Sequence, residues 1–168
     1  MKYAFVGYGS LMSHKFLKKT ISDKKFKPVI VKGYKRIFNV KDYKTDGSDV
    51  LNLEKSKENY LNGVFFHVNE EELRKIKIRE DDYELQKVNV YDFNTKKRIN
   101  KCFLVVDHYL FLDRKKGKPN RSYFVLCREA AYHISKKFGV MWDNTTYVLS
   151  GEKVFNWIKN NKKYDTIN

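Results

Sequence analysis

Alternating hydrophobic and polar positions dominate the first two thirds of the chain and predict strands. A period of two, or a dense content of β-branched and aromatic residues, marks five segments: residues 2–8, 29–40, 60–68, 83–93 and 98–106. The second segment is expected to bend at Gly33, and Asn94 and Thr95 supply the turn of a hairpin between the last two. The polar stretch 42–59 is expected to be a loop, with at most a brief strand over 50–53.

Helical periodicity replaces this alternation elsewhere, mostly in the last third of the chain. Four helices are expected. Two are short: one over 13–20, capped by Ser10 or Ser13, and one over 70–78, capped by Asn69. A long helix is expected from Asn120 or Ser122 to Gly139, and a last helix begins at its cap Ser150. Strands interrupted by short helices, and followed by helices, indicate an α+β fold. The long crossover helices of a doubly wound parallel sheet are too few here.

Length and composition restrict the class of protein. A chain of 168 residues fits one domain spanning 1–168, and 42% hydrophobic with 15% aromatic residues excludes intrinsic disorder. An apolar run of about 18 residues, as a membrane-spanning helix needs, is missing, and the first residues lack the charged region of a signal peptide. Cys102 and Cys127 lack zinc-site spacing, so we expect buried thiols in a cytoplasmic protein.

The formal net charge of +15 raises the question of a polyanionic partner such as nucleic acid. The positive residues are 28 Lys and only 7 Arg, whereas Arg is the side chain that binds phosphates and guanines in a bidentate way. They are dispersed along the chain, and 14 Asn accompany them, which fits a bias toward A/T-rich codons. A solvated basic surface is therefore favoured, and a nucleic-acid-binding domain stays open as the less favoured alternative.

Two segments could carry chemistry. Gly7, Tyr8, Gly9, Ser10 and Leu11 follow the first strand, and backbone N–H groups in such a loop can face an anion. The loop lacks the ending of a phosphate loop, so a plain tight turn is the alternative. The second segment, 80–82, carries three acidic residues after a helix; one could be a buried base, and a solvated acidic loop is the alternative.

Single side chains elsewhere in the sequence indicate less about the function. Tyr123, in the first turn of the long helix, could offer its hydroxyl group to a cleft or could simply be part of the core. The four histidines show no spacing for a metal site or a Cys–His pair. The residues alone therefore leave the function open.

Taken in order, these segments resemble gamma-glutamylcyclotransferase-like proteins. The resemblance runs from about residue 3 to 93 and rests on FVGYGSLM (5–12), VKGYKRIFN (31–39), LNL (51–53), NGVFFHV (62–68), EL (72–73), IKIREDDY (76–83) and VNV (88–90). The helix that contains Tyr123 is similar to the late substrate-site helix of the family. The resemblance implies a small mixed β-barrel flanked by helices, with the cleft at one barrel end and with no metal or cofactor.

The resemblance also implies roles for particular residues. Glu80 matches the acid/base glutamate of the family, Tyr8, Gly9, Ser10 and Leu11 match the loop that holds the α-amino and α-carboxylate groups, and Tyr123 matches a tyrosine lining the pocket. The implied reaction releases 5-oxoproline from a γ-glutamyl peptide or γ-glutamylamine, a small-molecule substrate. A binding module that keeps the pocket without catalysis is the alternative from another class. The leaving amine and the oligomeric state are not predicted.

Overall fold

The computed structural model of the chain describes residues 1–42, 46, 48–79, 83–107 and 116–167, with the backbone only for 83 and 100–107. In this part of the chain the strands are Lys2–Gly7 (β1), Lys27–Lys41 (β2), Asp49–Asn69 (β3), Tyr83–Asp92 (β4), Arg98–Asp107 (β5) and Thr146–Tyr147 (β6). They form one sheet in the order β3-β1-β5-β4-β2-β6, and β3 also pairs with β2. The pairs are antiparallel except for β1–β5 and β2–β6.

The long pairing of β2 with β3 corrects one prediction. The stretch 42–59 was expected to be mainly a loop, yet β3 is a continuous strand over Asp49–Asn69. Residues 55, 57 and 58 are exposed, so the hydrophobic alternation that marks a strand is missing there, although Glu54 and Lys55 pair with Lys35 and Tyr34 of β2. The expected bend at Gly33 is confirmed: the register shifts between Lys32 and Tyr34, and Gly33 has a φ of 87°.

The helices are η1 (Ser10–Met12), α1 (His14–Leu17), α2 (Glu70–Arg79), α3 (Arg121–Ile134), α4 (Lys136–Thr145), α5 (Val154–Trp157), η2 (Ile158–Asn160) and η3 (Lys162–Tyr164). Local caps are confirmed for three of them. Ser13 Oγ accepts from Phe16 N–H, and the Asn120 side chain accepts from Tyr123 N–H. Asn69 and Glu72 accept each other's backbone N–H at the start of α2, which is a capping box.

Two helix boundaries differ from the prediction. Gly139 does not end the long helix, because Ser135 breaks it and caps α4, which contains Gly139. A Cβ at Gly139 would lie 2.3 Å from Cγ of Tyr132, so this glycine allows α4 to approach α3. The last helix begins after Lys153 and its cap makes no side-chain hydrogen bond, so Ser150 is not its cap.

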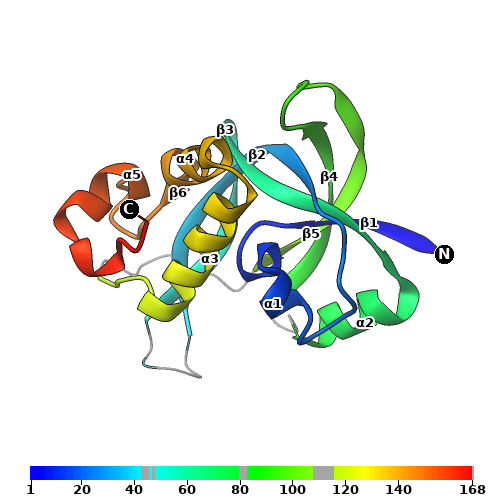
Figure 1. Cartoon of the computed structure of the whole chain (residues 1–168), viewed down its shortest axis with the longest axis horizontal. Coiled ribbons are helices and arrows are strands. Elements are labelled where there is room, and N and C mark those ends of the chain that lie inside the picture. Colours follow the sequence, from blue (N-terminus) through cyan, green and yellow to red (C-terminus); the bar gives the residue numbers. More distant parts are fainter. Residues whose placement is uncertain (43–45, 47, 80–82, 108–115, 168) are drawn as a thin grey trace.

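The layers meet around one core. Figure 1 shows the sheet in the middle, α1 and α2 on the side toward the N-terminus, and α3, α4 and α5 on the side toward the C-terminus. Buried aromatic residues of β1, β2, α3 and α4 contribute to one hydrophobic cluster, among them Phe5, Phe38, Phe124 and Trp142. The α+β class is confirmed, with a mainly antiparallel sheet and helices on its sides, and the barrel stays a prediction.

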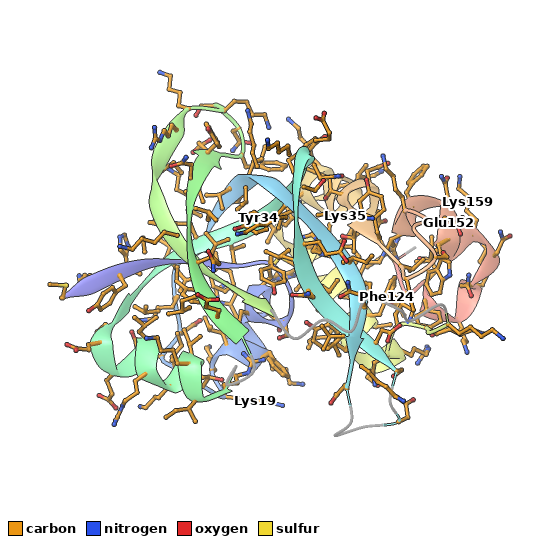
Figure 2. All side chains as sticks on the ribbon, turned by 180° about the vertical axis from the view of Figure 1, so that it is seen from behind. Lys19, Tyr34, Lys35, Phe124, Glu152 and Lys159 are labelled. Atoms are coloured by element: carbon orange, nitrogen blue, oxygen red, sulfur yellow. The ribbon has the colours of Figure 1, made fainter. Side chains whose placement is uncertain are left out.

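Charge and hydropathy agree with the expectations for a chain of this composition. No helix in the described residues is long and apolar enough to cross a membrane. Figure 2 shows Lys19, Lys35 and Lys159 on well-separated parts of the surface, in keeping with dispersed basic residues. Cys127 is a buried free thiol, as expected, and the Cys102 side chain lies outside the described residues.

Candidate active site

The loop of Tyr8, Gly9, Ser10 and Leu11, called the 8–11 loop below, joins β1 to helix η1. Tyr8, Ser10 and Leu11 are all buried. Met12 N–H donates to the carbonyl of Gly9, and Ser13 N–H donates to the carbonyl of Ser10. Among the described residues, the backbone N–H groups of Gly9, Ser10 and Leu11 have no hydrogen-bond acceptor.

Tyr123 reaches this loop from the first turn of α3. A Cβ built on Gly9 would lie 2.8 Å from the Tyr123 hydroxyl oxygen, so a side chain at position 9 would collide with it. The hydroxyl group also hydrogen-bonds to the Cys127 thiol one turn further along α3. Burial raises the pKa of Cys127 to about 12, which keeps this thiol protonated and unreactive at neutral pH.

Arg79, the last residue of α2, approaches the loop from the other side. Its Nη2 donates to Oγ of Ser10 at 2.9 Å, and its guanidinium lies 4.6 Å from the centre of the Phe16 ring of α1. The contact joins residues 69 positions apart in the sequence, so it fixes the end of α2 against the loop. Glu80, the predicted base, follows Arg79 in the chain and lies outside the described residues.

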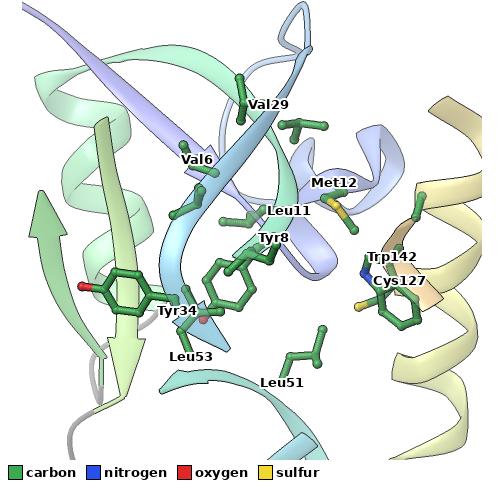
Figure 3. Packing of buried hydrophobic residues seen from close by; sticks show 14 of the residues in the cluster. Val6, Tyr8, Leu11, Met12, Val29, Tyr34, Leu51, Leu53, Cys127 and Trp142 are labelled. Atoms are coloured by element: carbon green, nitrogen blue, oxygen red, sulfur yellow. The ribbon is translucent and has the colours of Figure 1, made fainter. Parts of the chain in front are cut away.

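A second positive side chain, Arg36, lies under the loop. Arg36 of β2 is fully buried, and its Nη1 donates to the carbonyl of Tyr8 at 3.2 Å. Its guanidinium also lies 5.1 Å from the centre of the Trp142 ring. In Figure 3 the Tyr8 ring lies near Leu11 and Leu53. Cys127 and Trp142 lie together on the other side of the view.

The structure thus brings together the predicted residues that it describes. Tyr8, Gly9, Ser10 and Leu11 form one loop, and Tyr123 touches it at Gly9. Their roles in binding stay predictions, as does the catalytic role of Glu80.

Sequence reasoning missed two arginines at this site. Arg36 alternates with the buried Tyr34 and Phe38, and this spacing could have indicated an inward side chain. Arg79 had no signal except that it precedes the acidic segment.

The described residues contain no group of three or more His, Cys, Asp or Glu side chains arranged to hold a metal ion. The polar groups around the 8–11 loop are instead N–H donors, hydroxyl groups and two guanidinium groups, which suit an anionic organic ligand.

The sequence pattern of the ChaC-like protein family matches residues 4–167 of the chain. The chain belongs to this family. No curated protein matches the sequence. The prediction of a gamma-glutamylcyclotransferase-like enzyme is therefore confirmed. The family match does not specify the substrate.

Solved structures similar to this ChaC-like chain share its fold. One described as a gamma-glutamyl cyclotransferase has a TM-score of 0.72 at 14% identity, covering 98% of this chain and 100% of that one. An uncharacterized protein from Homo sapiens has a TM-score of 0.73 at 15% identity, covering 96% and 98%. A gamma-glutamyl cyclotransferase from yeast, described as specific to glutathione, has a TM-score of 0.55 at 13% identity, covering 86% and 97%.

Proposed function

We propose that this ChaC-like protein is a γ-glutamyl cyclotransferase that releases 5-oxoproline from a γ-glutamyl peptide or γ-glutamylamine. The observation that carries the proposal is the convergence of three separate elements on the 8–11 loop: the loop itself, Tyr123 of α3 and Arg79 of α2. This convergence occurs in a family member whose fold is that of known cyclotransferases.

In the proposed reaction the substrate attacks itself. The α-amine forms a bond to the γ-carbonyl carbon, the five-membered lactam closes, and the bond from that carbon to the leaving amine breaks. Nucleophile and electrophile belong to one molecule, so much of the rate enhancement comes from orientation. The N–H groups of Gly9, Ser10 and Leu11, which have no acceptor in the part of the chain that the structure describes, support this role, because they can hold the α-carboxylate or stabilise negative charge on the carbonyl oxygen.

Proton transfer is the step that needs a side chain. An α-amine with a pKa of about 8 is mostly protonated at pH 7 and cannot attack until a base removes its proton. We assign this role to Glu80, which then returns the proton to the leaving amine. Two facts support the assignment: the match of Glu80 to the family's glutamate, and its position directly after Arg79, whose guanidinium hydrogen-bonds to Ser10.

Tyr123 has a supporting role in this proposal. Its hydroxyl group contacts the site at Gly9 and the Cys127 thiol, so it is held in one orientation at the wall of the loop. A ring fixed in this way can limit the space around the substrate's glutamyl portion. The leaving amine would extend away from this wall.

The experiment measures 5-oxoproline release by mass spectrometry from a panel of γ-glutamyl amides that differ in the leaving amine. Wild type, Glu80→Gln and Glu58→Gln are compared; Glu58 is an exposed glutamate of β3 and serves as the matched control. Release by wild type and Glu58→Gln, reduced about 100-fold or more in Glu80→Gln, supports the proposal. Equal release by all three variants contradicts the assignment of Glu80.

Absence of turnover in every variant has its own meaning. If wild type and Glu80→Gln bind γ-glutamyl ligands alike and neither releases 5-oxoproline, the protein is a binding module and the proposed activity is wrong.

A further inference from the structure

The outer face of the sheet carries a row of side chains that the proposed reaction does not use. Val31 of β2 is paired with Leu61 of β3 and with Val90 of β4, and all three are fully buried. Because side chains alternate between the two faces of a sheet, the residues next to these three point away from the core. Three such residues, one on each strand, are Lys32, Tyr60 and Tyr91.

These side chains are neighbours in space. Lys32 lies directly opposite Tyr60, and its Nζ lies 4.7 Å from the centre of the Tyr91 ring. Arg98 of β5 lies opposite Tyr91 and donates to the side-chain oxygen of Asn89 at 2.9 Å. Tyr60, Lys32, Tyr91 and Arg98, called the outer row below, therefore cross four strands and alternate rings with positive charges. Strands about 4.8 Å apart make this row about 14 Å long.

Further positive charge lies beside the outer row. Nζ of Lys96, in the β4–β5 turn, and Nζ of Lys137, in α4, lie 4.9 and 5.8 Å from the centre of the Phe93 ring. Phe93 follows Tyr91 by two positions, so these lysines extend the positive charge at the turn. Among the described residues, Lys32, Lys96, Arg98 and Lys137 make no ion pair.

Acidic neighbours offset little of this charge. Asp92 follows Tyr91, but its Oδ2 pairs with Lys27 at 3.2 Å and its Oδ1 accepts from the backbone N–H groups of Asn94 and Thr95. Glu58, two positions before Tyr60 on β3, is exposed. One free carboxylate thus stands against the four unpaired cations named above.

This combination fits one kind of partner. Positive residues that are dispersed along the sequence are brought together here by strand pairing, and the Tyr60 side chain beside them is 47% exposed. Single-stranded nucleic acid offers phosphates and unstacked bases, and sheets that bind it present aromatic rings among basic side chains. Lysine contacts a phosphate as a point charge and does not read bases. Lipid surfaces are instead bound by the apolar face of an amphipathic helix.

We propose that the outer row binds single-stranded nucleic acid without base selection. The Tyr60 ring stacks on a base, and Lys32, Arg98, Lys96 and Lys137 contact phosphates. The Tyr91 ring supports the ammonium of Lys32. This binding is a second function, and it does not depend on the proposed release of 5-oxoproline.

The experiment titrates the full chain onto a fluorescent oligothymidylate of about 15 nucleotides, within the range of known single-strand sites, and measures anisotropy at several salt concentrations. Tyr60→Leu is expected to weaken binding about tenfold, because it removes the stacking ring, and Tyr60→Phe is expected to keep the affinity. Lys32→Gln is expected to weaken binding and to reduce the slope of log K against log salt by about 0.7.

A second ring and lysine on the surface provide matched controls. Phe155 is 44% exposed, and Nζ of Lys159 lies 4.5 Å from the centre of its ring. Lys159 lies on the C-terminal helices, apart from the four strands (Figure 2). Phe155→Leu and Lys159→Gln repeat the two changes there and are expected to leave the affinity within about twofold of wild type. Thermal unfolding establishes that each variant is folded.

Several results would overturn the inference. Wild type that does not bind the oligonucleotide at about 100 mM salt has no such site. Equal losses in Lys32→Gln and Lys159→Gln would show that the net charge of the whole protein attracts the strand. Unchanged affinity in Tyr60→Leu, or equally tight binding of polyglutamate, would exclude base stacking. Binding to phosphatidylserine vesicles without binding to the oligonucleotide would identify a lipid surface as the partner.

Discussion

Two arginines are buried in the part of the chain that the structure describes, and their surroundings differ. Arg128 of α3 makes a bidentate ion pair with Asp143 of α4, at 2.8 and 2.9 Å, and a third bond to Asp165 near the C-terminus. Arg36 has neutral acceptors only. Hydrogen bonds to Asp143 raise the pKa of Arg128 despite its burial, whereas burial lowers the pKa of Arg36.

The difference lies in what each arginine holds together. Two carboxylates neutralise the charge of Arg128, which ties α3, α4 and the C-terminal segment together. Among the described residues, Arg36 donates to the Tyr8 carbonyl of the 8–11 loop, to Asn62 of β3, and to Thr145 and Thr146 at the end of α4. Asp143 acts on the charge of Arg36 without a hydrogen bond to it. One arginine therefore links helices through an ion pair, and the other links the sheet, the loop and α4 through neutral hydrogen bonds.

The largest expected effect concerns Arg128. Arg128→Met leaves Asp143 and Asp165 without their partner, and breaking a buried ion pair in this way costs about 3–5 kcal/mol of unfolding free energy. Urea unfolding measures the change. The folded variant is expected to release 5-oxoproline from a γ-glutamyl amide at the wild-type rate. A loss of unfolding free energy below about 1 kcal/mol, or a loss of release by the folded variant, would contradict the structural role.

A smaller effect is expected for a second structural ion pair, between Lys24 and Glu72. Burial tends to raise the pKa of Glu72, but hydrogen bonds from Lys24, Ser22 and Asn69 outweigh it and lower the pKa to about 2. Because the folded-state pKa lies below the unfolded value of about 4.5, the stabilisation is complete above pH 4.5 and is lost as the pH falls toward 2.

Glu72→Gln tests this pH dependence. The wild type is expected to lose about 2 kcal/mol of unfolding free energy between pH 4.5 and pH 2 through this group, and the variant is expected to lose correspondingly less. Unfolding curves over this pH range provide the measurement. Parallel pH profiles of the two proteins would show that the Lys24 pair contributes nothing to acid stability.

Much of the fold is predictable from the sequence because its determinants are local. The alternation over 29–40 and 83–93, and the side-chain caps at Asn69 and Asn120, depend only on neighbouring residues. The strand over 54–59 was not predictable, since its residues are polar and partly or fully exposed, and the pairing of Glu54 and Lys55 comes from β2. Helix contacts such as that of Gly139 with Tyr132 depend on tertiary packing as well.

The contrast between local determinants and tertiary packing also applies to the candidate site. The 8–11 loop stood out because small residues follow a strand, a pattern that is visible within five positions. Its partners did not stand out, because they come from distant parts of the chain: Arg36 lies 28 positions from Tyr8, and Arg79 lies 69 positions from Ser10. The hydrogen bonds of Arg36 to neutral acceptors, and those of Arg128 to carboxylates, are likewise set by tertiary packing, and no sequence pattern reports the neighbours of a buried side chain.

The most direct test of the central claim is turnover of a γ-glutamyl amide in water enriched in ¹⁸O, with the products analysed by mass spectrometry. Attack by the substrate's own amine uses no water, so the account predicts 5-oxoproline that carries no ¹⁸O and no free glutamate. Hydrolysis would place one ¹⁸O in the γ-carboxylate of released glutamate. Labelled glutamate as the first product would contradict a cyclotransferase.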